Sequence, residues 1–174
     1  MIAVVVRWIA AVCVIAGCGF HPSAARDAQP ADSTTIVMIP LTAWEVSSDG
    51  STWAATMLPN TNWGCSNCTR LFRTIVNDAP RSVEFEWASD NRARMSINGT
   101  SAFAAYWLPN YCTDATCCGK CCDSTANCLA NASTTQTLDA AALGLFTTGP
   151  NTIQWEVGQE GGGSGFYVVM KLFY

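Results

Sequence analysis

Ten cysteines give this chain most of its potential for chemistry, and eight of them fall in two clusters beyond residue 60. Eight thiols can pair into as many as four disulfide bridges, or sets of four can ligate zinc or iron as thiolates. Two pairs, Cys65 with Cys68 and Cys118 with Cys121, have the two-residue spacing that tetrathiolate sites use. The eight are Cys65, Cys68, Cys112, Cys117, Cys118, Cys121, Cys122 and Cys128.

The N-terminal segment indicates the compartment in which these thiols lie. Arg7 precedes an uncharged apolar run over residues 8–17, which is too short for a bilayer span and has the layout of an export signal. Its end, residues 15–18 (Ile-Ala-Gly-Cys), resembles the lipobox of bacterial lipoproteins. The resemblance implies that residues 1–17 are removed and that Cys18 is acylated and becomes the N-terminus. The alternative is a plain secretory signal that contains a cysteine.

The resemblance also implies a location. Gly19 follows the lipidated cysteine, where an aspartate would resemble the inner-membrane retention signal of enteric bacteria. We therefore expect a lipid anchor in the bacterial cell envelope, at the outer membrane. Export to an oxidising compartment favours disulfides over a metal site, so we expect no bound metal at the cysteines, although the pairing cannot be deduced.

Other reactive groups are scarce. The one histidine, His21, lies three residues from Cys18, in a segment (18–33) whose composition is typical of a flexible tether. Triads that need histidine are therefore excluded from the rest of the chain. Glu84 and Glu86 alternate with apolar residues and are interpreted as a solvated strand face rather than a glycosidase pair. We expect no enzyme activity.

Aromatic side chains in predicted loops form the candidate ligand site. Trp63 lies among asparagines, and Trp107 and Tyr111 flank Pro109 and Asn110 at the start of the second cysteine cluster. An indole face beside amide groups suits a sugar ring, which stacks through its C–H groups and forms hydrogen bonds through its hydroxyls. The alternative is that these are half-buried loop residues. The candidate ligand-binding residues are Trp63, Trp107, Asn110 and Tyr111.

Composition excludes some partners and supports a packed domain. Hydrophobic residues make up 49% of the chain and charged residues 13%, which is enough apolar material for a core. Loss of residues 1–17, which hold one Arg and no acid, leaves 8 basic and 13 acidic residues, a net charge of −5. Nucleic-acid binding needs the opposite balance and is not expected.

Period-two alternation predicts the fold. Val83, Phe85 and Trp87 alternate with polar residues, the pattern resumes over 92–97, and Asn98-Gly99 is a favoured hairpin turn. Together with a third apolar run over 103–107, these residues predict consecutive antiparallel strands. Further strands are predicted over 34–39, 42–46, 53–58, 71–76, 137–142, 153–157 and 166–174. Many short strands without a long helix predict an all-β sandwich or barrel over 34–174, with a cysteine-rich insertion at 108–133.

The order of these motifs resembles galactose-binding-like jelly-roll domains, over about residues 78–174. The matching residues are the Asn98-Gly99 hairpin, Asp139 before a small-residue stretch, and Gly149, Asn151 and Ile153 at the start of a strand. Such domains occur as non-catalytic parts of glycosidases and as carbohydrate-binding modules. The resemblance implies that Asp139 precedes a helical turn. It also makes structural calcium, near Asp49, Asp90 or Asp139, a candidate cofactor.

Two functions remain open at this stage. The first is a lipid-anchored, non-catalytic module that binds a carbohydrate or another surface polymer. The second is a structural or adhesive surface protein that engages a protein partner, or a second copy of itself, through the disulfide-stapled insertion. The insertion and the apolar final strand motivate the second.

Overall fold

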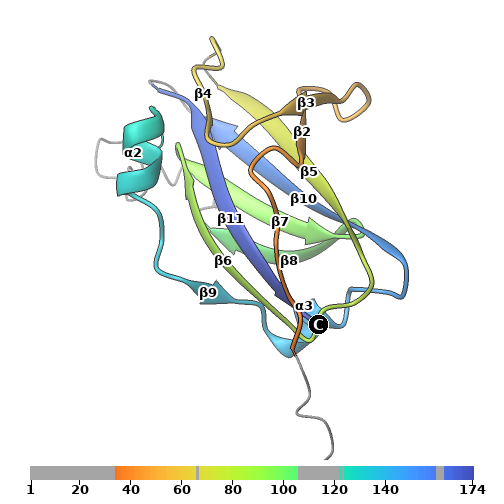
Figure 1. The fold of residues 1–174 in the computed structure, drawn as a ribbon. Coiled ribbons are helices and arrows are strands. Elements are labelled where there is room, and N and C mark those ends of the chain that lie inside the picture. The colour runs from red at the N-terminus through yellow and green to blue at the C-terminus, as the bar shows by residue number, and fades with distance from the viewer. Residues whose placement is uncertain (1–33, 66, 106–121, 123, 160–162) are drawn as a thin grey trace, which may run out of the picture. The chain divides into compact units, whose positions relative to one another are not determined.

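The computed structural model describes residues 34–65, 67–105, 122, 124–159 and 163–174. The range Thr34–Tyr174 forms one compact unit. Its strands form two antiparallel sheets, and the rings of Phe72 and Phe166, one from each sheet, lie 4.8 Å apart in the core between them. The predicted all-β sandwich is confirmed (Figure 1).

The first sheet has the order β1-β11-β6-β9, with β4 also pairing β11, and the second has the order β3-β2-β5-β10-β7-β8. Two short helices, α2 and α3, accompany them. The first sheet comprises β1 (Ile36–Met38), β4 (Asn60–Thr61), β6 (Ser82–Ser89), β9 (Gln136–Thr137) and β11 (Gly165–Phe173). The second comprises β2 (Trp44–Ser47), β3 (Ala54–Thr56), β5 (Cys68–Asn77), β7 (Arg92–Ile97), β8 (Thr100–Ala105) and β10 (Pro150–Gln159). The helices are α2 (Thr125–Ala130) and α3 (Ala140–Leu143).

Strand register defines two ends of the sandwich. At one end, here called the loop end, Cys68 pairs with Gln159 and Phe166 pairs with Ser89. At the other end, here called the base, Asn77 pairs with Pro150 and Phe173 pairs with Ser82. The described chain begins at the base, where Thr35 N–H donates to the Tyr174 carbonyl.

The alternation predicted from sequence corresponds to burial. Phe85, Trp87, Met95 and Trp155 are at most 2% exposed, and the tryptophan rings of Trp87 and Trp155 lie 6.3 Å apart. These indoles are packing residues, as predicted. The apolar final strand β11 lies between β1 and β6, and most of its residues are buried. Its composition is therefore explained by the core, so it offers no free apolar face to a partner.

The hairpin prediction is confirmed, and one prediction beside it needs correction. Asn98 and Gly99 both have positive φ, 52° and 82°, in the turn between β7 and β8. The preceding strand β6 does not pair with β7, because it belongs to the other sheet. The turn through Asp90 therefore carries the chain from one sheet to the other. Alternation predicts which face of a strand is buried, and it does not predict the partner strand.

The strand predicted over 137–142 is wrong beyond its first residue. Only Gln136–Thr137 pairs, and Ala140–Leu143 forms α3. The Asp139 carboxylate accepts a hydrogen bond from Ala142 N–H at 2.8 Å, which satisfies a free donor of the first turn. Alanine and leucine favour a helix once such a cap is present. The helical turn implied by the jelly-roll resemblance is present.

Candidate functional site

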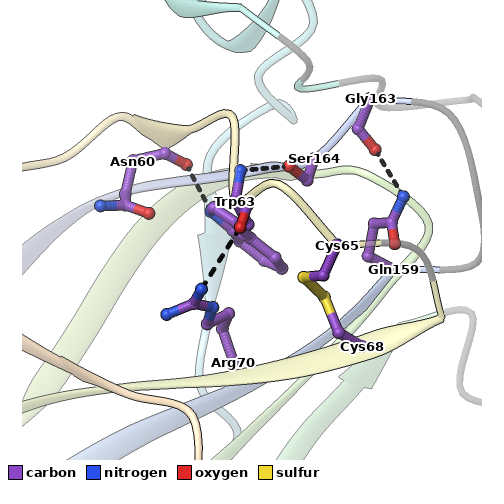
Figure 2. The surroundings of a disulfide bond; sticks show 8 residues. All are labelled: Asn60, Trp63, Cys65, Cys68, Arg70, Gln159, Gly163 and Ser164. Carbon is purple, nitrogen blue, oxygen red and sulfur yellow. Dashed lines mark hydrogen bonds between the residues drawn. A yellow bond between two sulfur atoms is a disulfide. The ribbon is translucent and has the colours of Figure 1, made fainter.

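Trp63 lies at the loop end, between β4 and β5, and its backbone is fixed from two directions (Figure 2). Its N–H donates to Ser164 Oγ at 2.7 Å, and its carbonyl accepts from Arg70 Nη2 at 3.5 Å. The indole N–H donates to the Asn60 carbonyl at 3.3 Å. The position of this ring is therefore set by three separate segments of the chain.

The Trp63 ring is half-buried. Its centroid lies 5.8 Å from that of Phe72, and the Arg70 guanidinium carbon lies 6.0 Å from the indole centroid. A cation at this distance is attracted by the ring quadrupole. Asn62 and Asn67 are exposed beside it, and both have positive φ, 60° and 54°. The arrangement combines an indole, a guanidinium and amide groups at one edge of the domain.

Two disulfides stabilise the loop end. Cys65 and Cys68 are bridged, which closes the loop directly after Trp63, as Figure 2 shows. Cys122 and Cys128 form a second bridge. The predicted disulfide framework is confirmed for these two pairs, and the remaining four cysteines lie outside the described residues. Because Cys65 is bonded to Cys68, this pair is not half of a tetrathiolate metal site.

The residues before β11 support the Trp63 loop. Gln159 is buried at the end of β10, and its Nε2 donates to the Gly163 carbonyl at 3.0 Å. Ser164 is also buried. Its hydroxyl accepts a hydrogen bond from Trp63 N–H, and its carbonyl accepts one from Asn62 N–H at 3.0 Å. The Trp63 loop and the start of β11 are therefore joined by two hydrogen bonds.

Three of the four predicted ligand-binding residues, Trp107, Asn110 and Tyr111, lie outside the described residues. Register nevertheless shows where their segment leaves the sheet. Arg70, Val157, Ala93 and Ala105 occupy one cross-strand row over four neighbouring strands. At about 4.8 Å between strands, Ala105 is about 14 Å from Arg70. Strand β8 therefore ends at the same end of the domain as Trp63. A joint site of Trp63 with these three residues stays a prediction.

The C-terminal part of the insertion returns to the first sheet. Ser124 caps α2, its side chain accepting from Asn127 N–H at 3.2 Å. Cys122 and Cys128 are fully buried against Ala88 and Tyr167. Ser133 then bonds to the backbone of β6 through its N–H and its hydroxyl. The Cys122–Cys128 disulfide is thus part of a small apolar cluster that is separate from the main core.

Sequence reasoning missed a polar surface on the outer side of the second sheet. A hollow of about 290 Å³ there is lined by side chains from β7, β8 and β10, and Arg94 forms an ion pair with Glu156 within it. Nearby, the Arg73 guanidinium lies 3.9 Å from the Trp53 ring centroid and 2.6 Å from the Glu45 carboxylate. The one sequence signal of this polar surface was the alternation of Arg92, Arg94 and Ser96 with apolar residues. The hollow is lined by Arg94, Met95, Ser96, Gly99, Ser101, Gln154 and Glu156.

Glu84 and Glu86 lie on the outer side of the first sheet, where they line a hollow of about 190 Å³ with Tyr167 and Lys171. Glu86 accepts a hydrogen bond from the Thr135 hydroxyl at 2.7 Å. Burial and then the Glu86 charge raise the pKa of Tyr167 above its ordinary 10.0. The Tyr167 phenol is therefore neutral at physiological pH. That the chain has no enzyme activity stays an expectation.

The three candidate calcium ligands occupy separate turns. Asp49 accepts hydrogen bonds from the backbone of Thr52 and Ser51, which hold the pKa of its carboxyl far below its ordinary 3.8. Asp90 is buried between β6 and β7, and Asp139 caps α3. In the part of the chain that the structure describes, no group of three His, Cys, Asp or Glu side chains is placed to hold a metal ion. Calcium remains an untested candidate cofactor.

Comparison with known proteins gives only distant similarities. No family model matches the chain, and no curated protein matches it. A calcium-binding mutant of β-glucuronidase 2 from Bacteroides uniformis is 14% identical with a TM-score of 0.49, covering 79% of this chain and 18% of that chain. A GH2 β-galacturonidase from Eisenbergiella tayi is 10% identical with a TM-score of 0.48, covering 80% and 24%. An FMN-binding β-glucuronidase from Facaelibacterium prausnitzii L2-6 is 14% identical with a TM-score of 0.47, covering 79% and 23%.

This chain spans less than a quarter of each of these three solved chains. At these identities and scores, the likeness assigns neither a family nor an activity to it. Neither of the two helices within the described residues is long and apolar enough to cross a membrane.

Proposed function

We propose that this chain is a lipid-anchored recognition module of the bacterial cell envelope that binds carbohydrate and does not catalyse a reaction. The observation that carries the proposal is the braced loop end, where the Trp63 indole, the Arg70 guanidinium and exposed asparagine amides lie together. A sugar ring needs an apolar face to stack on and hydrogen-bonding groups around its rim.

The bracing of this end supports binding rather than mere packing of a loop. Hydrogen bonds to Ser164 and Asn60, together with the Cys65–Cys68 bridge, constrain the Trp63 loop. A loop ordered before the ligand arrives loses less conformational entropy on binding. Strand β8 ends at Ala105 at this same end, and the sequence continues from there into the insertion with Trp107 and Tyr111.

The direction of the chain supports display from a membrane. Described residues begin at the base, whereas Trp63 lies at the loop end, and β11 runs between the two over nine residues. At about 3.4 Å per residue, this strand separates the two ends by about 30 Å. A chain held through Cys18 therefore joins the domain at the end remote from the proposed ligand site.

The test is a glycan and polysaccharide screen on protein that starts at Gly19, with its disulfides confirmed by mass spectrometry. Saturable binding that falls at least about fivefold in Trp63→Ala and in Trp107→Ala would support the site, since stacked aromatics contribute about 1–3 kcal/mol. Trp53→Ala is the matched control, because Trp53 is also a half-buried indole beside an arginine, on the outer side of the second sheet.

The outcomes separate location from function. Loss of binding in Trp53→Ala or Gln154→Ala alone would move the carbohydrate site to the polar hollow of the second sheet. No binding to any glycan would refute carbohydrate recognition. The anchor is tested separately by the mass of the N-terminal peptide from membranes, which should carry acyl chains on Cys18.

A further inference from the structure

A hollow of about 390 Å³ lies at the side of the sandwich between β1 and β5. Its lining combines aliphatic residues of these two strands with Pro40, Ala43 and a smaller number of polar residues. The lining residues are Val37, Met38, Ile39, Pro40, Ala43, Thr74, Ile75, Val76, Asn77, Asp78 and Tyr174. We call this hollow and its rim the side groove.

The side groove exists because two strand edges meet there without covering each other. Strand β2 pairs with β5 only over Leu71–Arg73, although β5 continues to Asn77. Strand β1 pairs only with β11. In soluble domains such edges are commonly covered or carry charged residues. Here, within the described residues, the rim carries aliphatic side chains instead.

The exposure of these side chains is high. Ile36 is 57%, Val37 42%, Met38 49% and Ile75 61% exposed. They make up four of the six large hydrophobic side chains that the described residues expose. Val37 and Met38 from β1 and Ile75 from β5 line the same hollow, from opposite sides of it. Exposed aliphatic residues grouped in this way mark a contact surface more often than scattered ones do.

Charge at the side groove argues against a contact driven by electrostatics. Asp78 lines the groove, its carboxylate accepting from Gly149 N–H, and Lys171 is the register partner of Met38. One acidic and one basic group give no excess of either sign. The partner must therefore be recognised through apolar contact, with little dependence on salt.

The groove lies close in sequence to the proposed lipid anchor. Ile36 is only eighteen residues from Cys18. Whatever its conformation, a segment of this length reaches at most about 65 Å. Tethering at such a range gives an effective concentration on the order of millimolar, so weak contacts become occupied. We propose that the side groove rests on the lipid surface to which the chain is anchored, with Ile36, Met38 and Ile75 in contact with lipid.

This inference rests on the lipid anchor of the proposed function. It adds that the domain lies against the bilayer through its side near the base, rather than moving freely at the end of its tether. Aliphatic side chains that lie at a membrane interface are stabilised by burial of their apolar area. The loop end with Trp63 is then held away from the lipid.

The test uses the full acylated chain, extracted from membranes and reconstituted in phosphatidylcholine vesicles with brominated acyl chains. A reporter indole is introduced in Met38→Trp, and Met57→Trp is the matched control. Met57 is another exposed methionine, 63% accessible compared with 49% for Met38, and it does not line the groove. The native tryptophans contribute the same background to both variants. The quenching of the added emission by bromine is measured at low and at high salt.

We expect bromolipid to quench at least about half of the added emission of Met38→Trp at either salt concentration, and little of that of Met57→Trp. Adding Ile36→Asp and Ile75→Asp to Met38→Trp should abolish the quenching, since both side chains are exposed and their replacement leaves the core intact.

Equal quenching of the two reporters would refute the contact. So would a concentration-dependent dimer that hides Met38→Trp from an aqueous quencher without lipid, because the occupant would then be a second copy. An unmodified Cys18 would remove the anchor, and this proposal with it. An acylated Cys18 with an unquenched Met38→Trp would refute the lipid contact alone and leave the anchor in place.

Discussion

Asn151 gives the most direct test of how the base of the sandwich is held together. It is fully buried at the start of β10, and its amide links three segments. Oδ1 accepts from Thr147 N–H at 2.7 Å and from Asn98 Nδ2 at 2.8 Å. Nδ2 donates to the carbonyls of Thr147 and Gly149, both at 2.8 Å, and to that of Asp78 at 3.3 Å. Replacement by alanine removes all of these bonds together.

The cost of Asn151→Ala follows from counting the groups left without a partner. A net hydrogen bond contributes about 1 kcal/mol, and a buried group without a partner costs about 1–3 kcal/mol. Thr147 and Asp78 are exposed, so water replaces part of the loss, and Asn98 keeps its bond to the Leu145 carbonyl. We therefore expect a loss of about 3–4 kcal/mol in the free energy of unfolding, near the upper range for single substitutions.

The assay is thermal and denaturant unfolding of the oxidised protein, with Asn77→Ala as control. Asn77 lies at the same end, and its side chain is exposed. At about 3–4 °C per kcal/mol for a domain of this size, Asn151→Ala should lower the Tm by about 10–15 °C, and Asn77→Ala by less than about 2 °C. Similar Tm values for the two variants would refute the view that this amide organises the base.

Three further predictions concern stability. Gly165→Ala should cost about 2–3 kcal/mol in unfolding free energy, because its Cβ would lie 1.8 Å from the Cys122 carbonyl oxygen; an unchanged denaturant midpoint would show that the two segments are not packed. Replacing both Cys65 and Cys68 by serine should cost about 2 kcal/mol through the freed unfolded chain, measured in the same assay, and equal midpoints would contradict this. Asp49→Ala should lower the Tm at neutral pH. Because hydrogen bonds depress the pKa of Asp49 in the folded state, its contribution to stability is fully present above pH 3.8 and is lost progressively as the pH falls below that value. The Tm difference between Asp49→Ala and the unsubstituted protein should therefore shrink toward pH 2, and a constant difference would count against this prediction.

Much of the fold could be predicted because its signals are local. The Asn98-Gly99 turn requires positive φ at both residues, and these residue types tolerate it. Alternation placed Phe85 and Met95 inward without any knowledge of their neighbours. The assignment of β6 and β7 to different sheets could not be predicted, because pairing depends on contacts between residues far apart in sequence.

The candidate site was predicted less completely, for the same reason. Trp63 was selected for its asparagine-rich loop, whereas its contacts with Phe72 and Ser164 depend on the tertiary fold. The polar hollow of the second sheet required the register that places Glu156 opposite Arg94. Alternation showed that Arg94 faces water and gave no sign of that neighbour.

The topology also bears on how much this domain tolerates sequence change. The insertion leaves from β8, the outermost strand of its sheet, and its other end is fixed where Ser133 bonds to the backbone of β6. No strand pairing of the described residues depends on what connects these two points. The cost of closing a loop grows slowly with its length. Cys122 and Cys128 pack against Ala88 and Tyr167, so the part of this segment from Cys122 onward is tied to the sandwich. The part before Cys122 is therefore a natural place for evolution to lengthen, shorten or exchange sequence, and for an engineer to graft a foreign peptide, while the sandwich keeps its register.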